Sequence, residues 1–242
     1  MTQKQMLDDL LARLQHALGD NLDSLVLYGS AAAKDGSFSI EYSDLNVLCL
    51  VNRLDPATLQ RIAPAVAWWE DHKQPAPMLF TIDELRRSAD VFAIELYDIK
   101  QRHRVLFGAD HFTSLEVPMD LHRVAVEREL RTNLIKLRQK YMALASGHAS
   151  RPIVQLMADS VSSFATLFRH SLIALGEEPP QHKREAVDRV ADKLAFDRKP
   201  FDQVFDLREG KVSESEIDAE ATFSGYLRAI ERVVDEVDKR LG

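Results

Sequence analysis

The sequence contains one cysteine, Cys49, in 242 residues, which excludes an internal disulfide bond. Cys49 lies within an apolar run, where a small buried core residue is the usual interpretation and a reactive thiol is rare. No cysteines and histidines cluster with the spacing of zinc ligands, and no Gly-Lys-Ser or Gly-Lys-Thr loop is present. The sequence therefore gives no support for a disulfide scaffold, a common zinc module or a P-loop nucleotide site.

Long apolar runs and excess positive charge are also missing. No apolar stretch reaches the ~20 residues that a membrane-spanning helix needs, and the N-terminus lacks a secretory signal, so we expect a cytoplasmic protein without a membrane partner. Lysine and arginine total 31 against 38 aspartates and glutamates, which gives a net charge of −7. Nucleic-acid binding depends on a basic surface, so no nucleic-acid partner is expected.

The first part of the chain mixes helical and strand patterns. Apolar residues repeat at helical spacing from Met6 to Leu18, and a second helix is expected to start at Asp55-Pro56. A capping box at Thr81 and Glu84 predicts the start of a third helix. Strands are predicted at residues 25–28, 45–51, 78–80 and 92–97, and residues 104–107 either extend the sheet or pack beneath it.

Everything after Pro118 shows helical spacing. Two long helices, two shorter ones and a long last helix are predicted, and Ser213 to Glu216 is expected to cap the last of them. Long antiparallel helices joined by short loops form a bundle. We therefore predict an α+β protein with a mixed-sheet domain at 1–112 and an all-α bundle at 113–242.

One stretch of the first domain carries features of a phosphate site. The apolar run that ends at Tyr28 stops at Gly29-Ser30, and small residues follow, which indicates a strand, a tight turn and a helix start. Free backbone N–H groups at a helix start suit a phosphate, and Ser30 adds a hydroxyl. The next apolar run opens with Asp44 and Asn46, which a strand would project from one face. We expect both beside the phosphate.

This pattern resembles the DNA polymerase β-type nucleotidyltransferase superfamily, in its small bacterial aminoglycoside- and antitoxin-type branch. The family signature is an apolar strand, Gly-Ser, a loop, and then Asp-apolar-Asp at the start of another apolar strand. The resemblance implies a nucleotidyltransferase-like mixed sheet with flanking helices, followed by a helical bundle. It also implies transfer of a nucleoside monophosphate from an NTP to a hydroxyl of a small molecule or protein.

The resemblance carries over to particular residues. It implies that Gly29, Ser30 and Lys34 contact the nucleotide, although Lys34 is equally well explained as a solvated side chain. Asp44 and Asn46 occupy the positions of the Mg²⁺ ligands.

A third family carboxylate, which completes the metal site and often acts as a base, is less clear from the sequence. The predicted strand at 78–80 carries no acid, whereas the one at 92–97 carries Glu95, which is the candidate we favour. His103 lies in the run 100–104 and is expected in a charged surface turn.

Asn46 departs from the family pattern, which has a second carboxylate at this position. An amide oxygen brings no charge, so holding two divalent ions close together should be much less favourable. Asp35 and Glu41 lie in the nearby loop, but we do not expect either to replace the missing charge.

Three hypotheses about function follow from this departure. The first is an active transferase, and the second is a catalytically impaired descendant that binds nucleotide or a protein partner. The third places the function in the helical bundle, as a homodimer interface.

Overall fold

The computed structural model describes residues 1–32, 44–145, 150–180 and 182–239, so Lys34, Asp35 and Glu41 lie outside the described residues. The chain divides into two compact units, Met1–Met119 and Asp120–Gly242. The first unit extends past residue 112 because Phe112 and Leu115 are buried in its core.

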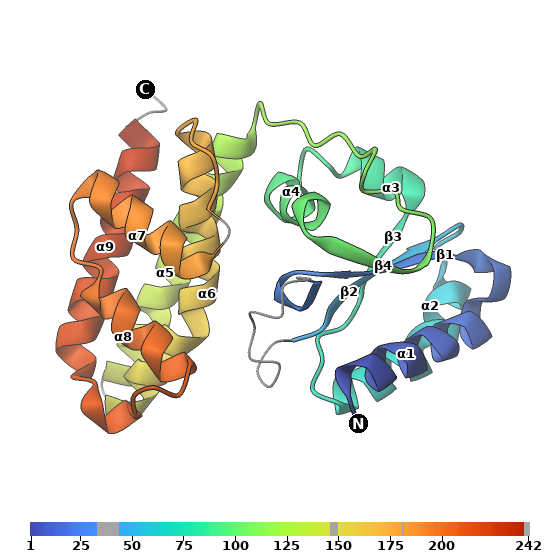
Figure 1. Cartoon of the computed structure of the whole chain (residues 1–242), viewed down its shortest axis with the longest axis horizontal. Helices are drawn as coiled ribbons and strands as arrows, with labels where there is room; N and C mark the ends of the chain where they lie inside the picture. Colours follow the sequence, from blue (N-terminus) through green and yellow to red (C-terminus); the bar gives the residue numbers. More distant parts are fainter. Residues whose placement is uncertain (33–43, 146–149, 181, 240–242) are drawn as a thin grey trace. The chain divides into compact units, whose positions relative to one another are not determined.

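The first unit is built on a four-stranded sheet with the order β3-β2-β1-β4 (Figure 1). The central strand β1 (Leu22–Tyr28) pairs antiparallel with both β2 (Asn46–Val51) and β4 (His103–Gly108). The edge strand β3 (Met78–Thr81) runs parallel to β2. The sheet is therefore mixed, as predicted, and residues 104–107 extend it instead of packing beneath it.

Helices cover both faces of this sheet. On one face, α1 (Gln3–Leu18) and α2 (Pro56–Asp71) pack against inward-facing strand residues such as Leu25 and Leu27. On the other face, α3 (Ile82–Arg87) and α4 (Ala93–Gln101) pack against residues such as Val26. A sheet that is buried on both faces needs apolar residues at consecutive positions, which explains the continuous apolar runs of β1 and β2.

The strand predicted at residues 92–97 is wrong, because this segment begins the helix α4. Its apolar residues satisfy a period of two over a few positions, but the buried set continues at helical spacing through Leu96 and Ile99. Short apolar runs fit both periods, and only the later residues distinguish them.

The starts of α2 and α3 are set by the residues that the sequence indicated. The Asp55 carboxylate accepts a hydrogen bond from the Thr58 backbone N–H at 2.7 Å, and proline follows at the first helical position. At α3, Thr81 and Glu84 form the reciprocal capping box, in which each side chain accepts from the other residue's backbone N–H. Both helix starts are confirmed.

The second unit is a bundle of the helices α5 (His122–Ala145), α6 (Ser150–Ala174), α7 (Lys183–Leu194), α8 (Lys199–Arg208) and α9 (Ala219–Lys239) (Figure 1). Helix α6 contacts all four of the others and is buried over much of its surface, as expected for a central helix. This confirms the predicted α+β architecture. Within the described ranges, no helix is long and apolar enough to cross a membrane.

The capping box at Ser213 forms, but it starts the short 3-10 helix Glu214–Glu216 and not α9. The long helix is capped instead by Asp218, whose carboxylate accepts from the Ala221 backbone N–H at 3.1 Å. The sequence therefore identified the motif correctly and assigned it to the wrong helix.

Candidate functional site

The candidate site lies where β1 ends and β2 begins. Gly29 follows β1 with φ of +76°, a backbone conformation that favours glycine. A Cβ atom placed on Gly29 would lie 3.5 Å from Nδ2 of Asn46, so the amide stands directly against this turn. Ser30 then begins the 3-10 turn Ser30–Ala32, in which the Ala32 N–H donates to the Gly29 carbonyl at 3.2 Å. The strand, tight turn and helical start therefore occur in the predicted order.

Asp44 and Asn46 lie on the other side of the loop. Asp44 precedes β2 and is exposed, whereas Asn46 is the first residue of the strand and is half-buried. Nδ2 of Asn46 donates to the Asp44 backbone carbonyl at 3.4 Å. Leu45 anchors the segment, because its side chain is buried and its N–H donates to Oε1 of Gln74 at 2.7 Å. Within the described residues, the two oxygens of the Asp44 carboxylate and Oδ1 of Asn46 have no hydrogen-bond partner. These three oxygens could therefore contact a ligand.

Three polar side chains form a row across the end of the sheet. Tyr28 pairs with Asn46 of β2 on one side and with His103 of β4 on the other. Cross-strand partners project to the same face, and Tyr28 packs against the core that α3 and α4 cover. The row was not predicted, because a single sequence does not reveal which strands are neighbours.

His103 is not in a charged surface turn, so that expectation is wrong. It opens β4, its side chain is only 12% exposed, and its Nε2 lies 3.2 Å from Oδ1 of Asp110. Its Nδ1 hydrogen-bonds the Ile99 carbonyl of α4 at 2.9 Å. These two bonds fix the ring and connect β4 to the neighbouring helix.

Glu95 lies on α4 and not on a strand, but its charge reaches this part of the sheet. Its side chain is exposed. Burial raises the pKa of the Tyr28 hydroxyl, and the nearby negative charge of Glu95 raises it further. Glu95 is therefore within electrostatic reach of Tyr28, the strand neighbour of Asn46. Its role as the third carboxylate stays a prediction.

The donors at this site limit the metal that it can accept. Among the described residues, no group of three or more His, Cys, Asp or Glu side chains is arranged to hold a metal ion. Mg²⁺ usually keeps several waters and binds one or two carboxylates together with substrate phosphates. The Asp44 carboxylate and the Asn46 amide oxygen fit one such ion next to a triphosphate. They do not make a preformed two-ion site.

A mixed sheet with a Gly-Ser turn after its central strand and an acid before the next strand, followed in the sequence by a helical bundle, defines the nucleotidyltransferase-like fold. The structure is similar to that of the spectinomycin adenyltransferase AAD(9) from Enterococcus faecialis, determined with ATP and spectinomycin. The match has a TM-score of 0.61 at 15% sequence identity and covers 96% of this chain and 99% of the other. No family model and no curated protein matches the sequence. At this identity the similarity establishes the fold.

Proposed function

We propose that the protein binds a nucleoside triphosphate at the end of β1 and β2 and transfers its nucleoside monophosphate to a hydroxyl of a small molecule or protein. The observation that carries this proposal is the contact between the Gly29 turn and Asn46, with the Asp44 carboxylate next to it, which has no partner among the described residues. The similarity to an adenyltransferase structure that holds ATP supports the same reaction class.

Each residue of the site has a role in this reaction. The turn at Gly29 and Ser30 would hold the phosphates through backbone N–H groups, because such groups favour anions. Asp44 and Asn46 would hold Mg²⁺, which would neutralise part of the phosphate charge when it is bound. Glu95 is the carboxylate available to accept the proton of the attacking hydroxyl. Transfer forms a bond from the acceptor oxygen to the α-phosphorus and releases pyrophosphate.

A second candidate function is nucleotide binding or protein interaction without turnover. The observation that favours it is Asn46, which leaves Asp44 as the one carboxylate of the two strand positions. Two divalent ions held close together repel strongly unless carboxylates compensate their charge. A site of this kind would bind NTP and release no pyrophosphate.

Pyrophosphate release distinguishes these two functions. The purified protein is incubated with each NTP, Mg²⁺ or Mn²⁺ and a mixture of hydroxyl acceptors. If the transferase proposal is correct, release is acceptor-dependent and Asp44→Ala reduces it by about 100-fold or more, as expected for loss of a group that stabilises the transition state. Asn46→Asp leaves the rate unchanged or raises it, because it restores a second carboxylate.

Asp9→Ala is the matched control, because Asp9 is an exposed acid on α1 of the same unit. It should leave the rate unchanged. NTP binding with no release in any mixture would contradict the transferase and support the second candidate. Full activity in Asp44→Ala would contradict the site itself.

A further inference from the structure

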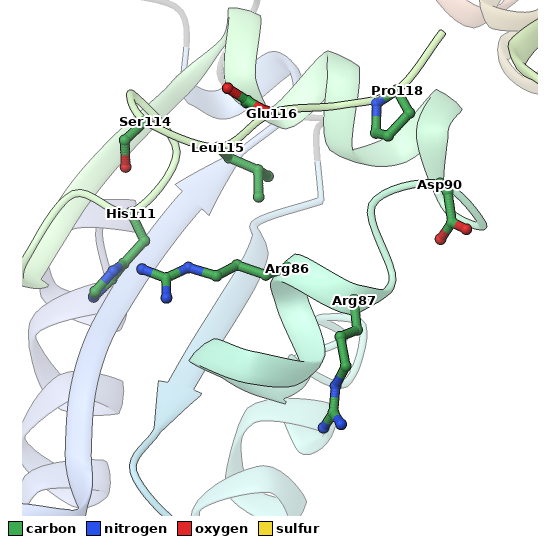
Figure 2. A pocket seen from close by; sticks show the side chains of 8 residues that line it. All are labelled: Arg86, Arg87, Asp90, His111, Ser114, Leu115, Glu116 and Pro118. Carbon is green, nitrogen blue, oxygen red and sulfur yellow. The ribbon is translucent and has the colours of Figure 1, made fainter. Parts of the chain in front are cut away.

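A cavity lies on the first unit, between α3 and the segment that follows β4 (Figure 2). Its volume of about 660 Å³ lies within the range typical of small-molecule sites. It is next to Asp23 near the start of β1, whereas Gly29 follows the end of this strand. Six residues of extended strand span roughly 20 Å, so this cavity is separate from the nucleotide site.

Arg86 of α3 supplies a cationic side chain to this cavity. Its guanidinium extends across the opening toward the ring of His111 (Figure 2). Within the described part of the chain, the Arg86 guanidinium has no hydrogen-bond or ion-pair partner. A guanidinium carries five N–H donors in a planar fork, which matches the oxygens of a carboxylate or phosphate.

His111 faces Arg86, and a contact with Asp23 fixes the orientation of its ring. Its Nε2 lies 2.6 Å from Oδ2 of Asp23, and its side chain is 19% exposed. Among the described residues, the other ring nitrogen, Nδ1, has no partner. The Ser114 side chain lies on the same side of the cavity as His111 (Figure 2) and adds a hydroxyl. A fixed ring, a hydroxyl and a free guanidinium therefore line one space.

The remaining lining sets the size and charge of a ligand. Leu115 and Pro118 supply apolar surface for a carbon skeleton. Arg86 and Arg87 bring two positive charges to the lining, and Asp90 and Glu116 bring two negative charges that balance them formally. This arrangement favours a ligand with one or two negative charges over a polyanion.

We propose that this cavity binds a small organic anion through a carboxylate or phosphate group held by the guanidinium of Arg86 and the hydroxyl of Ser114, beside the fixed ring of His111. The site is independent of the proposed nucleotidyl transfer, because it shares no residue with the Gly29 turn, Asp44 or Asn46.

The proposal is tested by amide NMR titration of the whole protein with inorganic phosphate and, separately, with acetate, at constant ionic strength. Saturable shifts are expected at residues 111–116 with at least one of the two probes, and the tighter probe identifies the oxyanion class. Arg86→Gln should weaken binding about tenfold, because a charge-assisted hydrogen bond contributes at least that much.

Arg87→Gln is the control, because it makes the same charge change at the next residue. Arg87 also lines the cavity, but its side chain points away from His111 (Figure 2), so its loss should change the affinity by less than about twofold. Both arginines are exposed on α3, so neither change should disturb folding, and the amide spectrum verifies this. Equal weakening in both variants would show general charge attraction and overturn the proposal. Absence of saturable shifts with both probes would overturn it as well.

Discussion

At the scale of single residues, Gly108 is the least tolerant of a side chain among the described glycines. It ends β4 with φ of +77°, and a Cβ atom there would lie 1.9 Å from the backbone carbonyl oxygen of Asp23. Strand backbone cannot move away without breaking the pairing of β1 with β4. Gly108→Ala should therefore destabilise the protein by several kcal/mol, of which about 1–2 kcal/mol comes from the left-handed backbone alone.

Gly176→Ala separates the cost of the left-handed backbone from the cost of the steric clash. Gly176 has φ of +80°, and a Cβ atom there would meet nothing within 4 Å. Its cost should be only that of the backbone conformation, about 1–2 kcal/mol. Urea denaturation measures both variants, and equal costs would contradict the predicted clash at Gly108.

Asp110 gives a prediction about pH. Partial burial alone would raise the pKa of its carboxyl, but hydrogen bonds from the Thr113 hydroxyl, His103 and the backbone N–H groups of Thr113 and Phe112 lower it to about 2. The folded pKa is thus below the ordinary 3.8. The stability that this group contributes is present above pH ~4 and is lost as the pH falls toward 2.

Asp110→Asn tests this prediction, because asparagine has the same shape but does not titrate. The variant should melt at a lower temperature than the natural protein at pH 6, and the gap should narrow as the pH falls from 4 toward 2. Melting curves at several pH values measure the gap. A constant gap over this range would contradict the prediction.

The residues of the candidate site were predictable to different degrees. Gly29 and Asp44 are recognisable because each belongs to a local pattern, a turn after an apolar run and an acid before one. Tyr28 and His103 were not recognisable as part of the same row, because their proximity depends on strand order. Glu95 was selected for a strand that does not exist. It nevertheless lies near Tyr28, because α4 covers the same face of the sheet.

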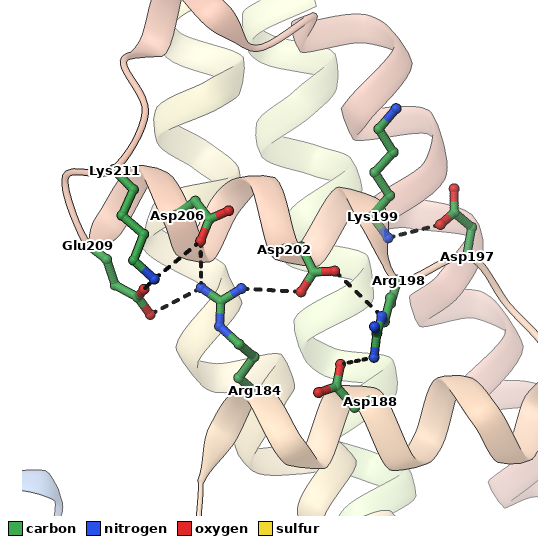
Figure 3. A network of polar contacts seen from close by, with 9 residues as sticks. All are labelled: Arg184, Asp188, Asp197, Arg198, Lys199, Asp202, Asp206, Glu209 and Lys211. Carbon is green, nitrogen blue, oxygen red and sulfur yellow. Dashed lines mark hydrogen bonds and ion pairs between the residues drawn. The ribbon is translucent and has the colours of Figure 1, made fainter. Parts of the chain in front are cut away.

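At the scale of secondary-structure elements, α7 and α8 are joined by a network of charged side chains (Figure 3). Arg184 of α7 donates to Asp202 at 3.2 Å, to Asp206 at 2.9 Å and to Glu209 at 3.1 Å. Its guanidinium also lies 5.0 Å from the ring centre of Phe205. Arg184 therefore contacts all three acids, whereas Lys211 pairs with Asp206 and Glu209 and Arg198 pairs with Asp202.

Arg184→Gln should destabilise the bundle by about 1–2 kcal/mol at low salt, more than a single exposed ion pair contributes. The loss should be smaller in high salt, because salt screens both the attraction and the repulsion among the acids. Denaturation in urea with 50 mM and 500 mM NaCl measures the difference.

The control for Arg184 is Arg151→Gln. Among the described residues Arg151 pairs with Glu214 alone, and its side chain is 83% exposed. The change should cost less than about 0.5 kcal/mol at either salt concentration. Similar losses in the two variants would show that the network contributes no more than an isolated pair.

The two mistakes about elements have a common physical cause. Residues 92–97 fit the strand period only over a short window, and the Ser213 motif is a real cap whose helix ends after one turn. In both cases the local signal was genuine, and its extent was decided by packing further along the chain. The long bundle helices were predicted reliably, since their apolar repeat persists over many turns.

At the scale of the whole molecule, each unit has its own apolar core, so the two should unfold as separate cooperative units. Both tryptophans of the chain, Trp68 and Trp69, lie on α2 of the first unit. Tryptophan fluorescence therefore reports the first unit, whereas most of the helical circular dichroism comes from the bundle.

The Gly108→Ala variant tests this separation. It should move the fluorescence midpoint in urea to a lower concentration and leave the main transition of the helical signal in place. If both signals shift together by the same amount, the two units unfold as one.

The single thiol of the chain has a practical consequence. Cys49 is 1% exposed at the centre of β2, and burial raises its pKa to about 12. The thiolate is the form that reacts with maleimides, so the natural chain should remain unlabelled while it is folded. A cysteine introduced at one exposed position in each unit would therefore accept a fluorophore pair selectively, with no need to replace the native residue.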